Sequence, residues 1–171
     1  MILHTKRTFL RPLKVEDAPW FFELNQDPLV LRHTGDIPFT SISEAEHFLQ
    51  NYDQFEKFKV GRFAVIDITN HQFLGWSGLK YNKENGEYDL GFRFFRKFWN
   101  KGFATETAQK CLQYGFKSLN LDYIIGRADK DNTASIRVLE KIGMKYKKEI
   151  EFNDKLGVIY QIGKSEYLKE I

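Results

Sequence analysis

Three β-rich runs follow one another through the middle of this chain, and they constrain its fold more than any other feature. The runs are RFAVIDIT (62–69), FLGWSGLKY (73–81) and EYDLGFRFF (87–95), and Asn, His, Gly and Lys turn residues separate them. Short runs with such turns between them favour strands that pair antiparallel with their neighbours in sequence. We therefore predict a meander at the centre of a β-sheet.

Two amphipathic patterns precede this meander, behind a strand-like run at the start of the chain. Asp17 stands ahead of an apolar spacing at Trp20, Phe21 and Leu24, which predicts a short helix. In SISEAEHFLQNYDQF (41–55), the third residue, a serine, and a glutamate three residues later form a capping box. This pattern predicts a second helix that continues to the end of the segment.

The chain after the meander alternates helix and strand patterns. GFATETAQKCLQYGFKSL has apolar residues at helical spacing and predicts the main helix, which begins near residue 102. Then follow a strand, a helix that ends at a glycine, and a hairpin, in the runs YIIGRADK, NTASIRVLEKIG, KYKKEIEF and VIYQIGKSEYL. Since no linker, repeat or low-complexity tract divides the chain, we predict one α/β domain over residues 1–171 with a mixed sheet.

Composition excludes several classes of protein. A net charge of +3 is too small to indicate a nucleic-acid surface, so no direct nucleic-acid partner is expected. Cys111 is the only cysteine, which rules out an internal disulfide and a cysteine-based zinc site and suggests a reducing cytoplasm. No apolar run approaches the roughly 20 residues of a membrane span, so no membrane association is expected. Cys111 also falls on the apolar stripe of the main helix, which favours a packing role.

The segment RKFWNKGFATE (96–106) has two possible readings. It is either a strand-to-helix loop with a solvent-facing lysine or a phosphate cradle. A helix N-terminus has unpaired backbone N–H groups and a partial positive charge, and Gly102 would let a phosphate approach the backbone closely. The Walker pattern and the dinucleotide pattern GxGxxG are both absent, which disfavours the common nucleotide-binding folds.

Together, this loop and the helix that follows the next strand resemble the GCN5-related N-acetyltransferase (GNAT) family. WNKGFA corresponds to the family's acyl-CoA loop [QR]xxGx[GA], with Trp99 in the first position, and NTASIRVLEKIGM is similar to NxxSxxxxEKxGF. DLGFRFFRKFWNKGFATET and the opening LRPLKVEDA are similar to the branch that acetylates ribosomal-protein N-termini. The chain departs from that branch at Asp89, Phe95, Arg96 and Asn100, the last of which replaces a common glycine.

The resemblance implies a GNAT fold, with six to seven mostly antiparallel strands, about four helices and acetyl-CoA as co-substrate. It implies that the backbone of Arg93, Phe94 and Phe95 pairs with the pantetheine arm and that loop amides hold the diphosphate. The residues of that loop are Trp99, Asn100, Lys101, Gly102, Phe103, Ala104 and Thr105.

Two residues of the later helix complete the cofactor set that the resemblance implies. Asn132 would bond to the cofactor, although Asn is equally favoured as a helix N-cap. Arg137 would reach a cofactor phosphate, although an exposed helix arginine usually contacts only solvent. No metal is expected.

Each of the two candidate catalytic residues, Asp89 and Ser135, also has a structural interpretation. Asp89 is the candidate to orient or deprotonate the amine, directly or through water, and otherwise it is a solvated strand carboxylate. Ser135 would protonate the leaving thiolate, or it bonds back to the helix backbone. No histidine is assigned a role, because all four are expected in surface positions or near the start of the chain.

The expected function is acetyl transfer to a primary amine by direct attack in a ternary complex. Deprotonating an α-amine at pH 7 costs about 1 kcal/mol, against about 4.6 kcal/mol for a lysine-like amine, so an N-terminal acceptor needs less help from a base. The acceptor is a protein N-terminus or a small molecule, and the protein is expected to be a monomer or homodimer. The alternative is a non-catalytic acyl-CoA-binding or sensor module on the same fold.

Overall fold

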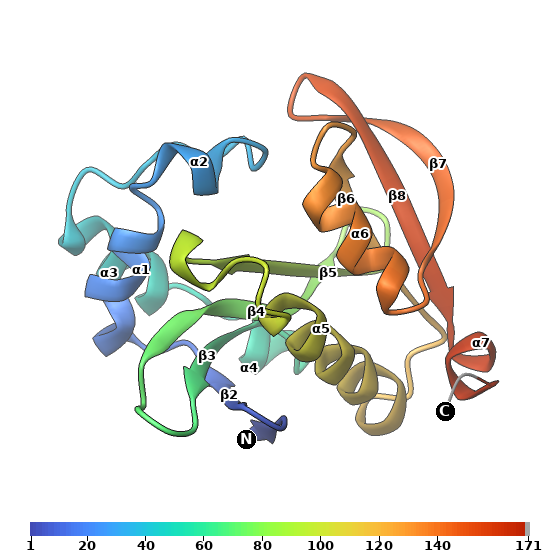
Figure 1. Ribbon diagram of the computed structural model, residues 1–171, viewed down its shortest axis with the longest axis horizontal. Helices are drawn as coiled ribbons and strands as arrows, with labels where there is room; N and C mark the ends of the chain where they lie inside the picture. The colour runs from blue at the N-terminus through green and yellow to red at the C-terminus, as the bar shows by residue number, and fades with distance from the viewer. Residues whose placement is uncertain (170–171) are drawn as a thin grey trace.

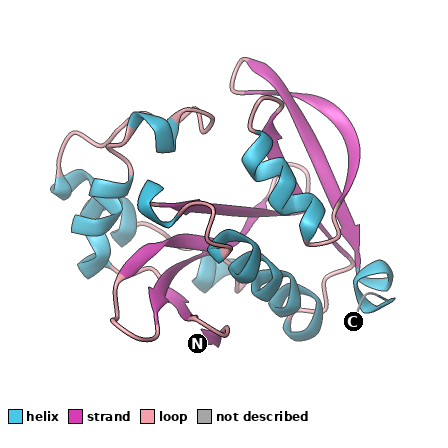
Figure 2. Ribbon diagram, viewed as in Figure 1, coloured by secondary structure: helices cyan, strands magenta, loops and turns pink. Residues whose placement is uncertain are grey.

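The computed structural model describes residues 1–169, which form one curved sheet with helices packed against it (Figures 1 and 2). The last two residues of the predicted domain lie outside this range. The strands are β1 (Leu3–His4), β2 (Thr8–Pro12), β3 (Arg62–Asp67), β4 (Phe73–Asn82), β5 (Glu87–Phe94), β6 (Tyr123–Asp129), β7 (Lys145–Phe152) and β8 (Lys155–Gly163). The helices are α1 (Ala18–Leu24), α2 (Pro28–Leu31), α3 (Ile42–Gln50), α4 (Gln54–Phe58), α5 (Phe103–Gln113), α6 (Thr133–Lys141) and α7 (Lys164–Lys169).

The eight strands described within residues 1–169 form a single sheet in the order β1-β2-β3-β4-β5-β6-β8-β7. Neighbouring strands are antiparallel except β5 and β6, which are parallel. The predicted meander is confirmed as β3, β4 and β5, and it lies at the middle of the sheet. The mostly antiparallel α/β fold is confirmed as well.

Two clusters of buried side chains lie against the sheet. The larger one joins α5 to the central strands through Ala108, Cys111 and Leu112. The smaller one packs α1 and α3 onto β3 and β4, with Phe21 and Trp76 among its members. The alternation of side chains along β4 and β5 separates the two clusters, since successive residues face opposite sides.

The structure has more elements than the sequence predicts. β1 adds a short edge strand beyond the expected six to seven, and α2, α4 and α7 add to the four expected helices. Each of these four added elements has six residues or fewer, which is too short to produce a recognisable periodicity.

Two predicted boundaries were wrong. The second helix is capped by Ser41, whose side chain accepts from the Glu44 N–H, and not by Ser43; it ends at Gln50, and the rest of the predicted helix becomes α4. The final strand stops at Gly163 instead of running to residue 168, because the Glu166 carboxylate accepts from the Gly163 N–H and α7 begins there.

No helix in the described part of the chain is long and apolar enough to span a bilayer.

Candidate active site

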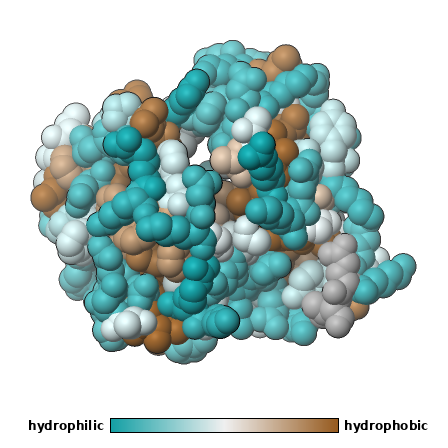
Figure 3. All heavy atoms as spheres, viewed as in Figure 1, coloured by the Kyte–Doolittle hydropathy of each residue, from teal (hydrophilic) through white to brown (hydrophobic). Residues whose placement is uncertain are grey.

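The cleft begins where β5 and β6 part. In the described structure these parallel strands pair only at Asp89 and Ile125, and beyond that point they diverge (Figure 1). The Phe95 N–H bonds to the Leu74 carbonyl on β4, so the N–H of Phe94 points to the opposite edge, towards the opening. Figure 3 shows a hollow between the part of the molecule that carries α1–α3 and the part that carries β6–β8.

The loop after β5 has the backbone of an anion-binding site. Asn100 and Gly102 both adopt left-handed conformations, with φ of 57° and 80°. Within residues 1–169, the N–H groups of residues 100–105 donate to no acceptor, and the first helical bond of α5 runs from Glu106 to Gly102. Successive amides around left-handed residues form a concave anion-binding surface, and α5 adds its N-terminal dipole. These residues therefore fit a diphosphate.

The departure at Asn100 now has a physical reason. Asn is the residue that, after glycine, most readily adopts the left-handed conformation, so it can replace the family's glycine at this position. Gly102 has the stricter requirement, because an added Cβ would lie 3.3 Å from the Arg7 guanidinium in addition to its positive φ.

Side chains hold this loop in place. Arg7 donates to Glu106 at 2.7 Å and to the Lys101 carbonyl at 2.8 Å, and its guanidinium lies 4.2 Å from the Phe103 ring centroid. On the other side of the loop, the Trp99 indole N–H donates to the Phe94 carbonyl at 2.9 Å. Trp99 thus connects the loop to the end of β5, which is a side-chain role in addition to the backbone role implied by the resemblance.

Asp89 lies at the base of the cleft. Its carboxylate accepts from the Arg127 backbone at 3.2 Å and from the Arg127 guanidinium at 3.0 Å, and its side chain is 24% exposed. Burial raises the pKa of Asp89 to about 6, although Arg127 opposes this shift. A carboxylate that titrates near neutral pH and faces a cleft can act as a general base.

A cavity of about 290 Å³ brings four of the predicted residues together. Asp89, Arg93, Asn132 and Ser135 all line it. The Asn132 side chain accepts from the Ser135 N–H at 3.2 Å, so Asn132 is the N-cap of α6, and its NH₂ group is still available for a ligand.

The remaining predicted residues lie outside this lining. Arg137 is exposed on α6, and Phe94 is buried in the core while its backbone borders the opening. Of the cradle residues, those from Trp99 to Gly102 lie between β5 and α5, and those from Phe103 to Thr105 form the first turn of α5.

Several residues that the sequence reasoning did not select also line the cavity. Arg127 pairs with Asp89, and His33 contacts Asp129 at 3.1 Å across the mouth of the cleft. Arg62 approaches the opening from β3. Their strand or loop positions were predictable, but their proximity depends on strand order, which no local pattern encodes.

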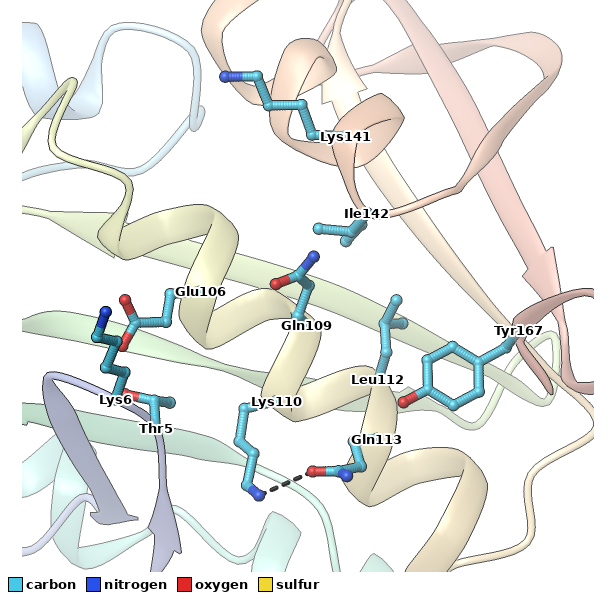
Figure 4. Close-up of a pocket in the computed structure, with 10 residues that line it drawn as sticks. All are labelled: Thr5, Lys6, Glu106, Gln109, Lys110, Leu112, Gln113, Lys141, Ile142 and Tyr167. Carbon is cyan, nitrogen blue, oxygen red and sulfur yellow. Dashed lines mark hydrogen bonds between the residues drawn. The ribbon is translucent and has the colours of Figure 1, made fainter. Parts of the chain in front are cut away.

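Another cavity, of about 570 Å³, lies between α5 and the C-terminal elements (Figure 4). It is larger than the cleft cavity, but its lining contains none of the predicted site residues. Figure 4 shows a mixed polar lining in which Lys110 donates to Gln113 at 2.8 Å. The β5–β6 cleft is the candidate active site, because Asp89 and its paired charges line it and the loop with the free amides follows β5.

Cys111 is buried beside Ser77, with 3.6 Å between the sulfur and the hydroxyl oxygen. Burial raises the pKa of its thiol to about 12, so little thiolate is present at neutral pH. The structure therefore favours the packing role.

Comparison with known proteins identifies the family. The family model described as "Acetyltransferase (GNAT) domain" matches residues 7–145. A Bacillus licheniformis protein named "Uncharacterized N-acetyltransferase p20" is 34% identical over 142 residues, covering 82% of this chain and 80% of the relative.

Solved structures share the fold. The crystal structure of a GNAT-family acetyltransferase from Bacillus anthracis has a TM-score of 0.83 at 27% identity, covering 96% of this chain and 99% of the other. Spermidine N-acetyltransferase from Vibrio cholerae, in complex with CoA and spermine, has a TM-score of 0.80 at 22% identity, covering 95% and 98%.

Proposed function

The chain belongs to the GNAT acetyltransferase family and is an N-acetyltransferase, and from that premise we propose that it acetylates a primary amine by direct attack in a ternary complex. The family uses acetyl-CoA. When bound, this co-substrate supplies an acetyl group activated as a thioester. The observation that carries the proposal is the row of free amides from residue 100 to 105, which follows β5, the strand that contains Asp89.

Different residues of the chain bind different parts of acetyl-CoA. The amides of the cradle bind the diphosphate, and the backbone of Arg93, Phe94 and Phe95 lies along the opening for the pantetheine arm, where the Phe94 N–H is free while the Phe95 N–H bonds to β4. The side chain of Asn132 and the guanidinium of Arg137 contribute further polar contacts. Arg93 contributes only its backbone to this task, since its side chain is bonded to Asp36 at 2.8 Å.

Two side chains, Asp89 and Ser135, transfer protons in the proposed reaction. Asp89 accepts a proton from the acceptor amine, directly or through water, and its pKa of about 6 leaves it mostly ionised at pH 7. The Ser135 hydroxyl donates a proton to the leaving thiolate. The N–H of Phe94 donates to the acyl oxygen as negative charge develops there.

The acceptor is a protein N-terminus or a small amine. The ribosomal-protein branch is supported only by the sequence pattern around DLGFRFFRKFWNKGFATET. A cytoplasmic location and a monomeric or homodimeric state stay predictions.

Calorimetry with acetyl-CoA, followed by thiol release with peptides and polyamines, tests this proposal. We expect micromolar binding of acetyl-CoA and thiol release with at least one amine. An absence of acetyl-CoA binding would refute it.

The alternative expected from the sequence is a non-catalytic acyl-CoA-binding module, which the family match and the relative named as an N-acetyltransferase argue against. The favouring observation is that Arg127 occupies both carboxylate oxygens of Asp89, which lowers the basicity of that group. Binding of acetyl-CoA without thiol release across a broad amine panel would support it.

A further inference from the structure

Most charged side chains of the cleft are neutralised in pairs. Arg93 donates to Asp36 at 2.8 Å. Arg127 donates to Asp89 at 3.0 Å and to Glu87 at 2.7 Å. Each of these two guanidinium groups therefore has a carboxylate partner within the protein.

Arg62 also lines the cavity, but it has no such partner. Its guanidinium carbon lies 4.6 Å from the ring centroid of Trp76, 5.4 Å from that of Phe48 and 5.8 Å from that of Tyr52. In the part of the chain that the structure describes, its side-chain nitrogens make no hydrogen bond or ion pair, and the nearby Asp36 carboxylate, which is bonded to Arg93, acts on it through charge alone. Burial lowers the pKa of Arg62, which reflects the cost of a cation removed from water.

The aromatic wall beside Arg62 contains a buried donor that is unsatisfied. The indole N–H of Trp76 is buried and has no acceptor among residues 1–169. The ring lies against Gly91, where an added Cβ would be 3.3 Å from its edge carbons. A buried indole N–H is normally satisfied, whereas the guanidinium of Arg62 is only partly buried and water can reach it. The orphaned N–H and the unpaired cation on one wall together indicate that an acceptor from outside the protein binds there.

The position of Arg62 relative to Asp89 follows from strand register. Arg62 is opposite Gly78, which is opposite Gly91, and Asp89 is two residues further along β5. All four residues therefore face the same side of the sheet. Two strand spacings and two residue rises separate the Cα atoms of Arg62 and Asp89 by about 12 Å.

We propose that Arg62 binds a carboxylate of the acceptor, so that the acceptor is an amine that carries a carboxylate several bonds away. This inference rests on the proposed function, because it places the amine at Asp89. The separation between Arg62 and Asp89 suits a dipeptide or an ω-amino acid better than glycine, whose amine and carboxylate are too close together. The cavity of about 290 Å³ has room for about ten water-sized volumes, which also suits a small molecule.

The same arrangement disfavours polyamines. A spermidine-like acceptor would bring further positive charge towards an unpaired guanidinium, and like charges in a partly buried site repel strongly. This chain would therefore differ in acceptor from the Vibrio cholerae enzyme, whose structure contains spermine.

The test measures binding and turnover of matched amines with CoA or acetyl-CoA present. 6-Aminohexanoate and glycylglycine are compared with their carboxamides, with glycine and with spermidine. A peptide amide with glutamate at its second position supplies the carboxylate from a side chain. We expect each amine that carries a carboxylate to bind at least tenfold more tightly than its carboxamide. The compound that binds most tightly then shows whether the carboxylate comes from a small molecule or from a peptide side chain.

Arg62→Met and Arg62→Lys separate recognition from packing. We expect Arg62→Met to raise the Kd for 6-aminohexanoate at least tenfold, to leave that for its amide and for CoA unchanged, and to keep the melting temperature. Arg62→Lys should retain part of the preference.

Equal binding of acid and amide, a preference for spermidine, or a large fall in the melting temperature of Arg62→Met would overturn the carboxylate assignment. Absent acetyl-CoA binding would instead refute the proposed function, so the two failures are distinguishable.

Discussion

Arg127 holds the carboxylate of Asp89 from two directions, with its backbone N–H at 3.2 Å from one oxygen and its guanidinium at 3.0 Å from the other. These bonds link β6 to β5 at the point where the two strands part. The same guanidinium reaches Glu87 at 2.7 Å. One cation therefore sets both the geometry at the base of the cleft and the proton affinity of the proposed base.

Asp89→Asn should remove the acidic limb of the pH–rate profile. Asp89 is deprotonated above its pKa of about 6, so wild-type activity should rise with pH through that value. We expect the variant to lose about 100-fold in kcat at pH 7.5. The deprotonation of the acceptor amine contributes equally to both enzymes, so the ratio of their rates isolates Asp89. If the acidic limb of the pH–rate profile is unchanged in Asp89→Asn, the general base is another group.

The stability of that variant follows from the same shift. Because folding raises the pKa of Asp89, its contribution to stability is greatest below pH 4 and declines as pH rises through 6. A rise of about two units corresponds to about 3 kcal/mol that ionisation of Asp89 costs the fold at pH 8. Asp89→Asn should therefore melt no lower than wild type at pH 8.

Arg127→Gln should move the acidic limb to higher pH. Arg127 lowers the pKa of Asp89 through its charge, its guanidinium bond and its backbone N–H bond. The substitution removes the first two and leaves the backbone bond, so the pKa should rise above about 6. The variant also leaves Glu87 and Asp89 without their cation, which should cost about 3 kcal/mol at pH 8 and less at pH 5. Denaturant unfolding at both pH values measures this difference.

Lys80→Gln is the matched control for Arg127→Gln. Lys80 also lowers the pKa of Asp89, but it is exposed and has the smallest of these effects. Removal of the Lys80 charge should shift the acidic limb of the pH–rate profile only slightly. Equal shifts in the two variants would contradict the assigned role of the Arg127 pair.

Asn132 has two roles that substitution can separate. Asn132→Asp keeps the oxygen that caps α6 but replaces the NH₂ donor with a negative charge, while Asn132→Ala removes both. If the amide contacts the cofactor, Asn132→Asp should weaken acetyl-CoA binding at least tenfold with little change in stability. Asn132→Ala should also destabilise the fold by about 1 kcal/mol. Wild-type affinity in the aspartate variant would leave only the capping role.

The central strands and the main helix were predictable because their signals are local. The meander is marked by turn residues, and α5 by a periodic apolar face that begins after Gly102. The free amides of the cradle follow from that helix start. The capping boundary at Ser41 was missed because two serines compete as caps within three residues.

The electrostatics of the site were not predictable from the sequence. Asp89 and Arg127 are 38 residues apart, and only the parallel pairing of β5 with β6 brings them together. Arg62 is informative only because no carboxylate in residues 1–169 forms an ion pair with it, and His33 only because it contacts Asp129. Such facts depend on tertiary contacts that a single sequence does not show.

Gly102→Asp should abolish acetyl-CoA binding, and Gly102→Ala provides the comparison that makes this result interpretable. Any side chain at Gly102 is strained, since φ is 80° and an added Cβ would lie 3.3 Å from the Arg7 guanidinium. Both variants therefore lose about 1 kcal/mol of stability or somewhat more. Only the aspartate adds negative charge beside the free amides, so calorimetry should show a Kd at least 100-fold weaker for Gly102→Asp and a smaller loss for Gly102→Ala. Equal losses would attribute the effect to backbone strain, and retained affinity in the aspartate variant would place the diphosphate away from this loop.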